Sequence, residues 1–309
     1  MNRDLPMISI VTPCLNRVQF VEEAIQSVLR QDYPEVEHIV VDGASTDGTL
    51  EILRRYRHLS LISEPDDGHF HAINKAIRLA KGEIIGHLNS DDFYEDNVFS
   101  SVAQRFLDDP ELDTLCGGAV VFDDGPEGKP VIVARYQRRR DKELSFHNVT
   151  LGAPIINARF FRRHVYERLG LYDTRYPIAS DREFLIRAAI AGVKHAEIEP
   201  LVYHYRRHSG SLSINREGSH LGPLLEEHIG LSERYLQNGS VPMEFRRLCR
   251  IWHTRETCRM ALQGLRSMGF RDAFRYVVRG FRHDAIWPWR VAPIAISRVL
   301  RASHLPARR

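Results

Sequence analysis

The first 90 residues alternate short apolar segments with segments that have the periodicity of a helix. The apolar segments, rich in β-branched residues, span residues 7–12, 36–41, 59–63 and 83–88. Helical patterns lie between them, over residues 20–29, around residues 50–53 and over residues 71–80. Strands that are joined by helices pair in parallel, and the helices then cover both faces of the sheet. We therefore predict an α/β fold with a mostly parallel, open sheet flanked by helices.

The pattern changes after residue 99. Residues 112–122, 130–136 and 193–205 have the composition of strands, and residues 160–169 and 181–191 have helical periodicity. From residue 216 to the end the pattern is mostly helical. We predict one α/β domain over residues 1–215 and an Arg-rich helical C-terminal extension over residues 216–309.

Charge is distributed unevenly along the chain, whose 309 residues have a net charge of +3. Residues 241–309 hold fifteen arginines, no lysine and four acidic residues, a net charge of +11, which leaves −8 for the first 240 residues. The acidic part suits a bound cation, and the basic part suits an anionic surface.

Aromatic and aliphatic residues interleave with the arginines of residues 270–309, among them Phe281, Trp287, Trp289 and Ile294. This composition is typical of segments that lie on anionic lipid, so we expect contact with an anionic membrane surface. A helical cap packed on the first domain is the alternative. No nucleic-acid-binding motif accompanies the charge, and we expect no nucleic-acid partner.

Composition and cysteine spacing point to a cytoplasmic protein. No segment has the ~18 uninterrupted apolar residues that a membrane-spanning helix needs. The first six residues have no long apolar run, so we expect no secretory signal. The four cysteines, Cys14, Cys116, Cys249 and Cys258, form no C-x-x-C pair and indicate reduced thiols. We expect a cytoplasmic location with peripheral contact at the inner face of the membrane.

Acidic residues follow the predicted strands of the first domain, at Asp42, Asp66, Asp67, Asp91 and Asp92. Ligands of open α/β sheets bind at the carboxyl ends of the strands. Carboxylates gathered there repel one another unless a cation or hydrogen-bond donors lie among them. The pair at residues 91–92 suits Mg²⁺ or Mn²⁺ bound together with a phosphate-bearing ligand. A cap for the helix that follows is the alternative.

Two common nucleotide-binding fingerprints are absent from the sequence. It contains neither G-x-G-x-x-G nor G-x-x-x-x-G-K-[ST], which disfavours a Rossmann dehydrogenase and a P-loop protein. Asp42 then has two interpretations. It accepts a hydrogen bond from a nucleotide base, or it caps a turn.

Five short blocks resemble glycosyltransferase family 2 in order and spacing. They are residues 9–16, VDGASTDGT at residues 41–49, SEPDDG at residues 63–68, AINK at residues 72–75 and LNSDD at residues 88–92. The resemblance extends over about residues 7–210 and implies the GT-A fold. It implies that Asp42 contacts the base of a nucleotide-sugar and that Asp91 and Asp92 form the metal-binding DXD-type motif. The donor-binding residues that it implies are Thr12, Pro13, Asn16, Asp42, Asp66, Lys75, Asn89, Ser90 and Asp91.

The second half of the resemblance supplies a base and a further metal ligand. Asp181 lies where the family has a carboxylate that opens a helix, and it resembles the catalytic base of an inverting transferase. A helix N-terminus would keep such a carboxylate ionised, and a simple helix cap is the alternative. His208 resembles the histidine that completes the metal site or touches the diphosphate.

The sequence also departs from the family pattern. His71 stands where the family often has aspartate, Ala76 where it often has glycine, and Asn89 replaces the first aspartate of a strict D-x-D. The Gln-x-x-Arg-Trp signature of processive polysaccharide synthases is missing.

The resemblance therefore implies a metal-dependent, inverting and non-processive glycosyltransferase. Such an enzyme moves one sugar from a UDP-, dTDP- or GDP-sugar to a hydroxyl of a glycan or lipid-linked acceptor, in the biosynthesis of cell-envelope polysaccharide. Two alternatives remain at this point. A nucleotidyltransferase would also use a metal, although the loop at residues 12–17 lacks the expected glycines. A catalytically silent nucleotide-sugar-binding module is favoured by His71 and Asn89.

Overall fold

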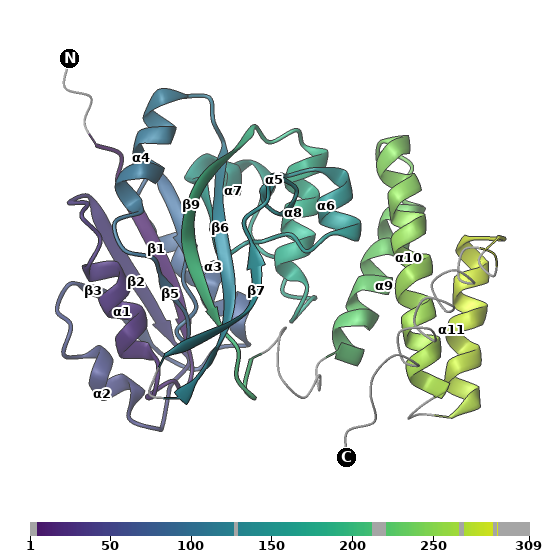
Figure 1. Cartoon of the computed structure of the whole chain (residues 1–309), viewed down its shortest axis with the longest axis horizontal. Coiled ribbons are helices and arrows are strands. Elements are labelled where there is room, and N and C mark those ends of the chain that lie inside the picture. Colours follow the sequence, from purple (N-terminus) through teal and green to yellow (C-terminus); the bar gives the residue numbers. More distant parts are fainter. Residues whose placement is uncertain (1–4, 127–128, 212–220, 266–268, 287–288, 290–309) are drawn as a thin grey trace. The chain divides into compact units, whose positions relative to one another are not determined.

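The computed structural model contains two compact units, residues 1–217 and residues 218–309. It describes residues 5–126, 129–211, 221–265, 269–286 and 289 (Figure 1). The predicted boundary at residues 215/216 lies outside the described residues, as do Trp287 and the tail after Trp289.

The first unit is built on one twisted sheet of nine strands (Figure 1). The strands are β1 (Ile8–Cys14), β2 (Val36–Asp42), β3 (Leu59–Ser63), β4 (Ile84–His87), β5 (Phe93–Tyr94), β6 (Thr114–Asp124), β7 (Pro130–Tyr136), β8 (Arg159–Arg162) and β9 (His195–Arg206). Their order is β3-β2-β1-β4-β8-β6-β9-β5, and β7 pairs with β6. The α/β fold with an open sheet is confirmed.

Pairing is parallel in the half of the sheet that the sequence predicts most clearly. β1 pairs in parallel with both β2 and β4, and β3 pairs in parallel with β2. Every residue of β1 is buried, as expected of a central strand with helices on both faces. Parallel strands all end at the same edge, so the loops after β1, β2 and β4 meet there.

Eight helices accompany this sheet in the described part of the first unit. They are α1 (Val21–Leu29), α2 (Thr49–Leu53), α3 (His69–Leu79), α4 (Phe99–Asp108), α5 (Arg139–Lys142), α6 (Phe146–Leu151), α7 (Arg163–Leu169) and α8 (Ser180–Ile190). Ala24 of α1 and Val102 of α4 share one core with Ile10 of β1. α3 packs against β1 and β2 from the opposite face (Figure 1).

The second half of the sheet differs from the prediction in two strands, β5 and β8, and residues 93–94 of β5 were not predicted as a strand. Residues 160–169, predicted as a single helix, form strand β8 followed by α7. β8 lies antiparallel between β4 and β6, so the sheet is mixed beyond β4. Phe160 and Phe161 point to opposite faces of this strand and both are fully buried. A four-residue strand that buries both faces has no period to distinguish it from a helical turn.

The second unit contains three described helices, α9 (Leu221–Gln237), α10 (Met243–Gln263) and α11 (Phe270–His283). Leu225 and Ile229 of α9, Met260 of α10 and Tyr276 of α11 form its apolar core. Within the described residues, none of the helices is long and apolar enough to cross a membrane.

A partly buried polar cluster also connects the three helices of this unit. Glu233 of α9 accepts hydrogen bonds from Arg279 of α11 (2.6 and 2.7 Å) and from His253 of α10 (3.2 Å). Burial opposes ionisation of Glu233, but the hydrogen bonds from Arg279 and His253 outweigh it and lower the pKa of Glu233 to about 2.

Candidate active site

A pocket of about 330 Å³ opens at the carboxyl ends of β1 and β4. Its walls come from the loops after β1, β3 and β4 and from the beginning of α8. Six of the residues singled out in the sequence line it: Pro13, Asp66, Asn89, Ser90, Asp91 and Asp181. Segments far apart in the sequence therefore meet at the sheet edge where ligands of open α/β sheets bind.

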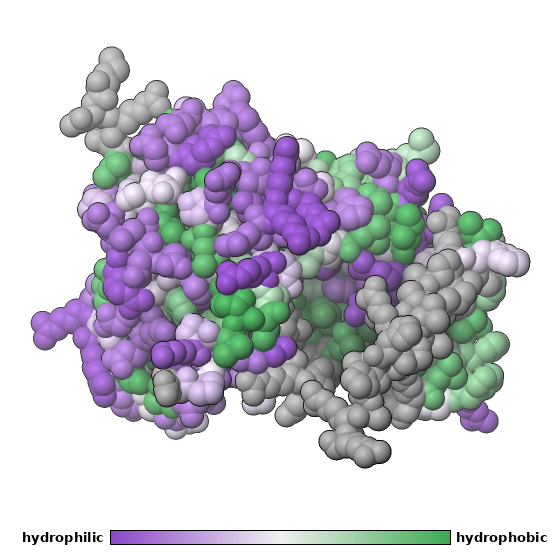
Figure 2. Space-filling view, viewed as in Figure 1, coloured by the Kyte–Doolittle hydropathy of each residue, from purple (hydrophilic) through white to green (hydrophobic). Residues whose placement is uncertain are grey.

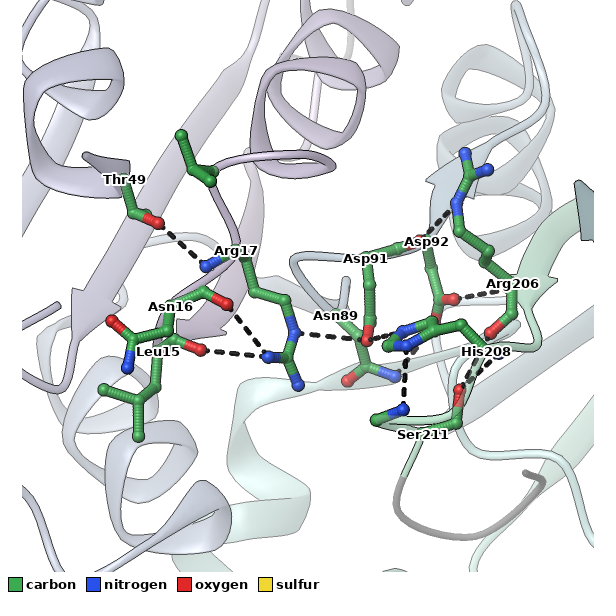
Figure 3. Close-up of polar contacts among 12 residues, drawn as sticks. Leu15, Asn16, Arg17, Thr49, Asn89, Asp91, Asp92, Arg206, His208 and Ser211 are labelled. Carbon is green, nitrogen blue, oxygen red and sulfur yellow. Dashed lines mark hydrogen bonds and ion pairs between the residues drawn. The ribbon is translucent and has the colours of Figure 1, made fainter. Parts of the chain in front are cut away.

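Asp91 lies in the pocket between two cationic or proton-donating side chains (Figure 3). Its Oδ2 is 2.9 Å from Nε2 of His208 and 3.4 Å from Nε of Arg17. Burial alone would raise the pKa of Asp91, but the hydrogen bond from His208 and the charge of Arg17 outweigh burial and lower it. Asp91 is thus held as a carboxylate on the pocket wall.

The ring of His208 is fixed by its neighbours. It stacks on Phe20 with 4.9 Å between ring centroids, and its Nδ1 accepts a hydrogen bond from the backbone N–H of Gly210 (3.1 Å). This bond places the ring proton on Nε2, which then donates to Asp91. Coordination of a metal through Nε2 would require that proton to move to Nδ1, with loss of the bond from Gly210.

A carboxylate oxygen and an imidazole nitrogen that meet at one point suit Mn²⁺ or Mg²⁺, with the remaining positions left to water and phosphate oxygens. Asp91 and His208 are the residues that could hold such an ion. In the structure, Arg17 and the Nε2 proton of His208 supply the positive partners that the ion would supply to Asp91.

Asp92 has the opposite environment, although it is the next residue. Its side chain is buried and accepts hydrogen bonds from the hydroxyl of Tyr203 (2.7 Å), the backbone N–H of Arg206 (2.7 Å) and Nδ2 of Asn89 (2.9 Å). Burial and the nearby charge of Asp91 raise its pKa well above the ordinary value. It does not line the pocket. These contacts make Asp92 a brace for the turn that presents Asp91.

Asp181 faces the pocket from the first turn of α8, opposite the loop after β4. Its Oδ1 accepts a hydrogen bond from the backbone N–H of Arg182 (2.6 Å). That bond and the charge of Arg182 favour ionisation, but burial outweighs them and raises the pKa of Asp181 above the ordinary value. That Asp181 is ionised at the start of its helix stays a prediction.

Two arginines anchor the start of α8 and so fix Asp181. The guanidinium of Arg182 donates to the carbonyl oxygens of Val149 (2.9 Å) and Thr150 (3.3 Å). Arg187 pairs with the fully buried Glu183 at 2.8 Å and donates to the carbonyl oxygen of Leu171. Rigid support of this kind holds a reactive carboxylate in one orientation.

Asp42 and Thr12 lie behind the pocket wall rather than on it. The buried carboxylate of Asp42 accepts hydrogen bonds from the backbone N–H and hydroxyl of Ser45 and from the hydroxyl of Ser63 (2.7 Å). Thr12 is buried with its hydroxyl 2.9 Å from Nε2 of His38, and burial lowers the pKa of His38 to about 3. The contacts of Asp42 agree with the interpretation as a turn cap.

Asn16 and Lys75 lie outside the pocket lining as well. The side-chain oxygen of Asn16 accepts from the backbone N–H of Thr46 (2.9 Å), which ties the loop after β1 to the loop after β2. Lys75 forms an ion pair with Glu64. The structure thus brings Asp181 and five of the nine predicted donor-binding residues, Asp91 among them, to one pocket, and leaves the other four outside its lining. Of the predicted metal ligands, Asp91 lines the pocket, while His208 contacts Asp91 from outside the lining.

The pocket wall also includes residues that were not predicted from the sequence, among them Arg17, His69 and His87. Burial lowers the pKa of His69 to about 4 and that of His87 to about 3, so both rings are neutral near pH 7. His87 is held by the hydroxyls of Tyr172 (3.1 Å) and Tyr166 (3.3 Å). His69 directly follows the Asp66-Asp67-Gly68 loop, and His87 ends the fourth strand. The available signals were the start of a helix after an acidic loop for His69 and the end of a strand for His87.

Comparison with known proteins adds the family. The model of glycosyl transferase family 2 matches residues 9–170, more than half of the chain. The chain belongs to glycosyltransferase family 2. This assignment confirms the resemblance that the five blocks carry.

The related sequences are glycosyltransferases from several bacteria. Over 125 residues the chain is 30% identical to the putative teichuronic acid biosynthesis glycosyltransferase TuaG of Bacillus subtilis, a match of 39% of this chain and 50% of TuaG. It is 25% identical over 218 residues to the hyaluronan synthase of Pasteurella multocida, covering 69% of this chain and 22% of the synthase. The chain thus spans half or less of the length of these two relatives.

Solved structures share the fold at lower identity. S. aureus TarS 1–349 in complex with UDP-GlcNAc superposes with a TM-score of 0.66 at 17% identity, covering 88% of this chain and 79% of that one. The mannosyltransferase PcManGT of Pyrobaculum calidifontis, in complex with GDP-Man and Mn²⁺, has a TM-score of 0.58 at 21% identity, covering 93% and 83%. These likenesses confirm the GT-A type of fold.

Proposed function

We propose that this family 2 glycosyltransferase is metal-dependent and inverting, and that it adds one sugar per acceptor. The observation that carries the proposal is that Asp91 and Asp181 both line one pocket. Asp91 is hydrogen-bonded to His208 and suits a cation. Asp181 is partly buried and suits a base. These are the two functions that displacement of a nucleoside diphosphate by a hydroxyl requires.

The proposed donor is a nucleoside diphosphate sugar with a UDP, dTDP or GDP moiety. Support comes from TarS, whose structures hold UDP or UDP-GlcNAc, and from PcManGT, whose structure holds GDP-Man and Mn²⁺. Pro13, Asp66, Asn89 and Ser90 form the donor side of the pocket, while Thr12, Asn16, Asp42 and Lys75 support the loops around it. Mg²⁺ or Mn²⁺, held by Asp91 and His208, supplies charge neutralisation for the departing diphosphate. Asp92 contributes by bracing Asp91.

Asp181 acts as the base in the proposed step. It accepts the proton of the acceptor hydroxyl while that oxygen forms a bond to the anomeric carbon and the bond between this carbon and the diphosphate oxygen breaks. Attack from the side opposite to the diphosphate inverts the anomeric centre. A raised pKa makes Asp181 a stronger base than an ordinary aspartate and brings it closer to the pH at which it works.

The acceptor is proposed to be a glycan or lipid-linked saccharide of the cell envelope, in keeping with TuaG, which is named for teichuronic acid biosynthesis. We place the enzyme in the cytoplasm, because its four cysteines are buried and free, with the basic extension at the inner face of the membrane. Residues 1–215 are proposed as the catalytic domain and residues 216–309 as the extension.

Substitution of the two pocket carboxylates tests this function. Asp181→Asn removes the base and should lower kcat by about 10²- to 10⁴-fold. Asp91→Asn weakens the cation site and should lower turnover by about 10²- to 10³-fold. Release of nucleoside diphosphate from a panel of donors and acceptors, with Mn²⁺ or with chelator, measures both losses.

Asp67→Asn is the matched control, because Asp67 is an exposed carboxylate of the same rim that does not line the pocket. Circular dichroism confirms that each variant folds. Turnover at the wild-type level in both pocket variants would refute the assignments. Donor binding without any turnover by the wild type would favour the silent binding module instead.

A further inference from the structure

Helix α11 presents an apolar stripe to solvent. Phe270 and Phe274 are 76% and 56% exposed, and Val278 and Phe281 are exposed as well. At 3.6 residues per turn these four side chains fall within about 80° of the helix circumference. The helix buries Ala273, Tyr276 and Gly280 against the rest of its unit. Figure 2 shows hydrophobic side chains gathered over α11. The stripe is therefore separate from the face that packs in the core.

Three exposed arginines, Arg271, Arg275 and Arg282, form a second stripe beside the apolar one. On the same helical projection they occupy about the next 40° of the circumference. The acidic residues of the helix and its end lie elsewhere: Asp272 is half-buried, and Asp284 is buried with Thr254 Oγ1 at 3.2 Å. The solvent side of α11 thus combines aromatic rings with arginines, of which Arg275 interacts electrostatically with Asp272 and Glu226.

A hollow adjoins the arginine stripe. It is lined by Arg275, Arg279 and Arg282 of α11 together with Glu233 and Gln237 of α9. Glu233, the acid of this hollow, is already neutralised by two hydrogen bonds from Arg279. The remaining arginines leave the hollow positive, which suits a phosphate group.

We infer that α11 is the membrane-docking element of this protein. The helix lies in the plane of an anionic bilayer, with Phe270 and Phe274 among the acyl chains and the arginines at the phosphate groups. Exposed aromatic rings flanked by arginine are the pattern of helices that bind at a lipid interface. Charge complementarity selects anionic lipid over a protein partner, because the chain from residue 241 onward carries a net charge of +11.

Two exposed residues beyond the helix extend the same surface chemistry. Ile286 and Trp289 are 50% and 80% exposed. Tryptophan prefers the interface between lipid and water, where its ring is apolar and its N–H remains hydrated. The inference deepens the membrane contact that belongs to the proposed function, and it does not depend on sugar transfer.

Vesicle co-sedimentation of the full chain, without any nucleotide, tests the inference. The anionic vesicles contain about seven parts of phosphatidylcholine to three parts of phosphatidylglycerol, and the neutral vesicles contain phosphatidylcholine alone. We expect binding to the anionic vesicles and at least tenfold weaker binding to the neutral ones. Phe270→Ser/Phe274→Ser should lower the affinity for anionic vesicles at least tenfold. Arg271→Gln/Arg282→Gln should remove the preference for phosphatidylglycerol, and high salt should do the same.

Matched controls come from the first unit. Val131→Ser/Val133→Ser removes exposed apolar side chains from β7, and Arg54→Gln/Arg55→Gln removes exposed arginines from the end of α2. Both controls should bind vesicles as the wild type does. All four substituted positions of α11 are exposed, so the variants should keep the wild-type melting temperature.

Three results would overturn the inference. The first is that the wild-type protein does not bind anionic vesicles. The second is that the phenylalanine variant binds them as the wild type does. The third is that light scattering shows a dimer for the wild type and a monomer for the phenylalanine variant. The last result would show that a second copy covers the stripe. Failure here leaves donor turnover untouched, and loss of turnover in Asp181→Asn leaves vesicle binding untouched, so the two proposals fail separately.

Discussion

Adjacent carboxylates can have opposite roles, as Asp91 and Asp92 show. A carboxylate on the pocket wall is followed directly by one that is 2% exposed and surrounded by three donors. Their pKa values move in opposite directions for this reason, down for Asp91 and up for Asp92. Ionising two carboxyl groups this close together in a buried site costs free energy. The surroundings therefore favour the ionised form of Asp91 and the neutral form of Asp92.

Asp181 gives a prediction at the same scale. Its pKa is raised by burial, and its active form as a base is the ionised one, so activity should increase as pH rises through that pKa. The half-maximal pH of the acidic limb of kcat/KM should therefore lie above 3.8, the ordinary value. Initial rates between pH 4 and pH 8 at fixed Mn²⁺ measure it.

The Asp181→Glu variant serves as the comparison. The longer side chain places its carboxylate at a different depth in the pocket. The pH dependence of kcat/KM should therefore keep an acidic limb, but the midpoint pH of that limb should change. An acidic limb that is identical in the wild type and in Asp181→Glu would assign the titration to another group.

Strand β4 shows how a single element places several site residues. It carries His87 at its end and leads into Asn89, Ser90 and Asp91. Close packing with β8 fixes its position, since Gly86 lies opposite Phe160. A Cβ atom on Gly86 would lie 2.6 Å from Cε1 of Phe160 and 2.9 Å from Cδ1 of Ile10. The strand therefore tolerates only glycine here without displacement of its neighbours.

Gly86→Ala should destabilise the first unit by about 1–3 kcal/mol through overpacking. Gly230→Ala is the matched control. Gly230 lies within α9, where an added Cβ meets no atom within 4 Å. Alanine should stabilise that helix by about 0.5–1 kcal/mol because it loses less backbone entropy. Thermal unfolding compares the two variants, and an unchanged melting temperature in Gly86→Ala would contradict the packing argument.

At the scale of the whole molecule, the two proposals concern different units. Every residue that lines the candidate active site precedes residue 218, and the exposed helix α11 belongs to the second unit. The charges follow the same division, with acidic residues concentrated before residue 241 and arginines after it. A donor that binds through a cation and a surface that binds anionic lipid need opposite potentials, and separate units provide them.

Ligand binding to the first unit should raise the melting temperature of the chain. A nucleoside diphosphate at 100 times its Kd stabilises the native state by about 2.7 kcal/mol. We expect this shift with UDP, dTDP or GDP in the presence of Mn²⁺, and a smaller one with chelator. Differential scanning fluorimetry measures it. Asp91→Asn should lose the Mn²⁺-dependent part and Asp67→Asn should keep it. Equal shifts with Mn²⁺ and with chelator would argue against a cation in the site.

Much of this protein follows from local pattern in its sequence. Period and composition predicted the parallel strands β1 to β4 and the helices between them, because short β-branched apolar runs and helical spacing of apolar residues are visible within each segment. The family was predicted from short blocks whose order and spacing can be recognised in a single sequence. That resemblance also predicted Asp91 and Asp181. Both kinds of information are local.

Tertiary structure decided what depends on contacts between distant segments. It placed β8 in the sheet, buried Asp92 under Tyr203 and Arg206, and enclosed Asp42 between Ser45 and Ser63. It also brought His69 and His87 to the pocket and turned the phenylalanines of α11 toward solvent. Burial decides each of these features. The surroundings of a buried side chain come from every element packed around it, so they cannot be predicted from the residue's own segment.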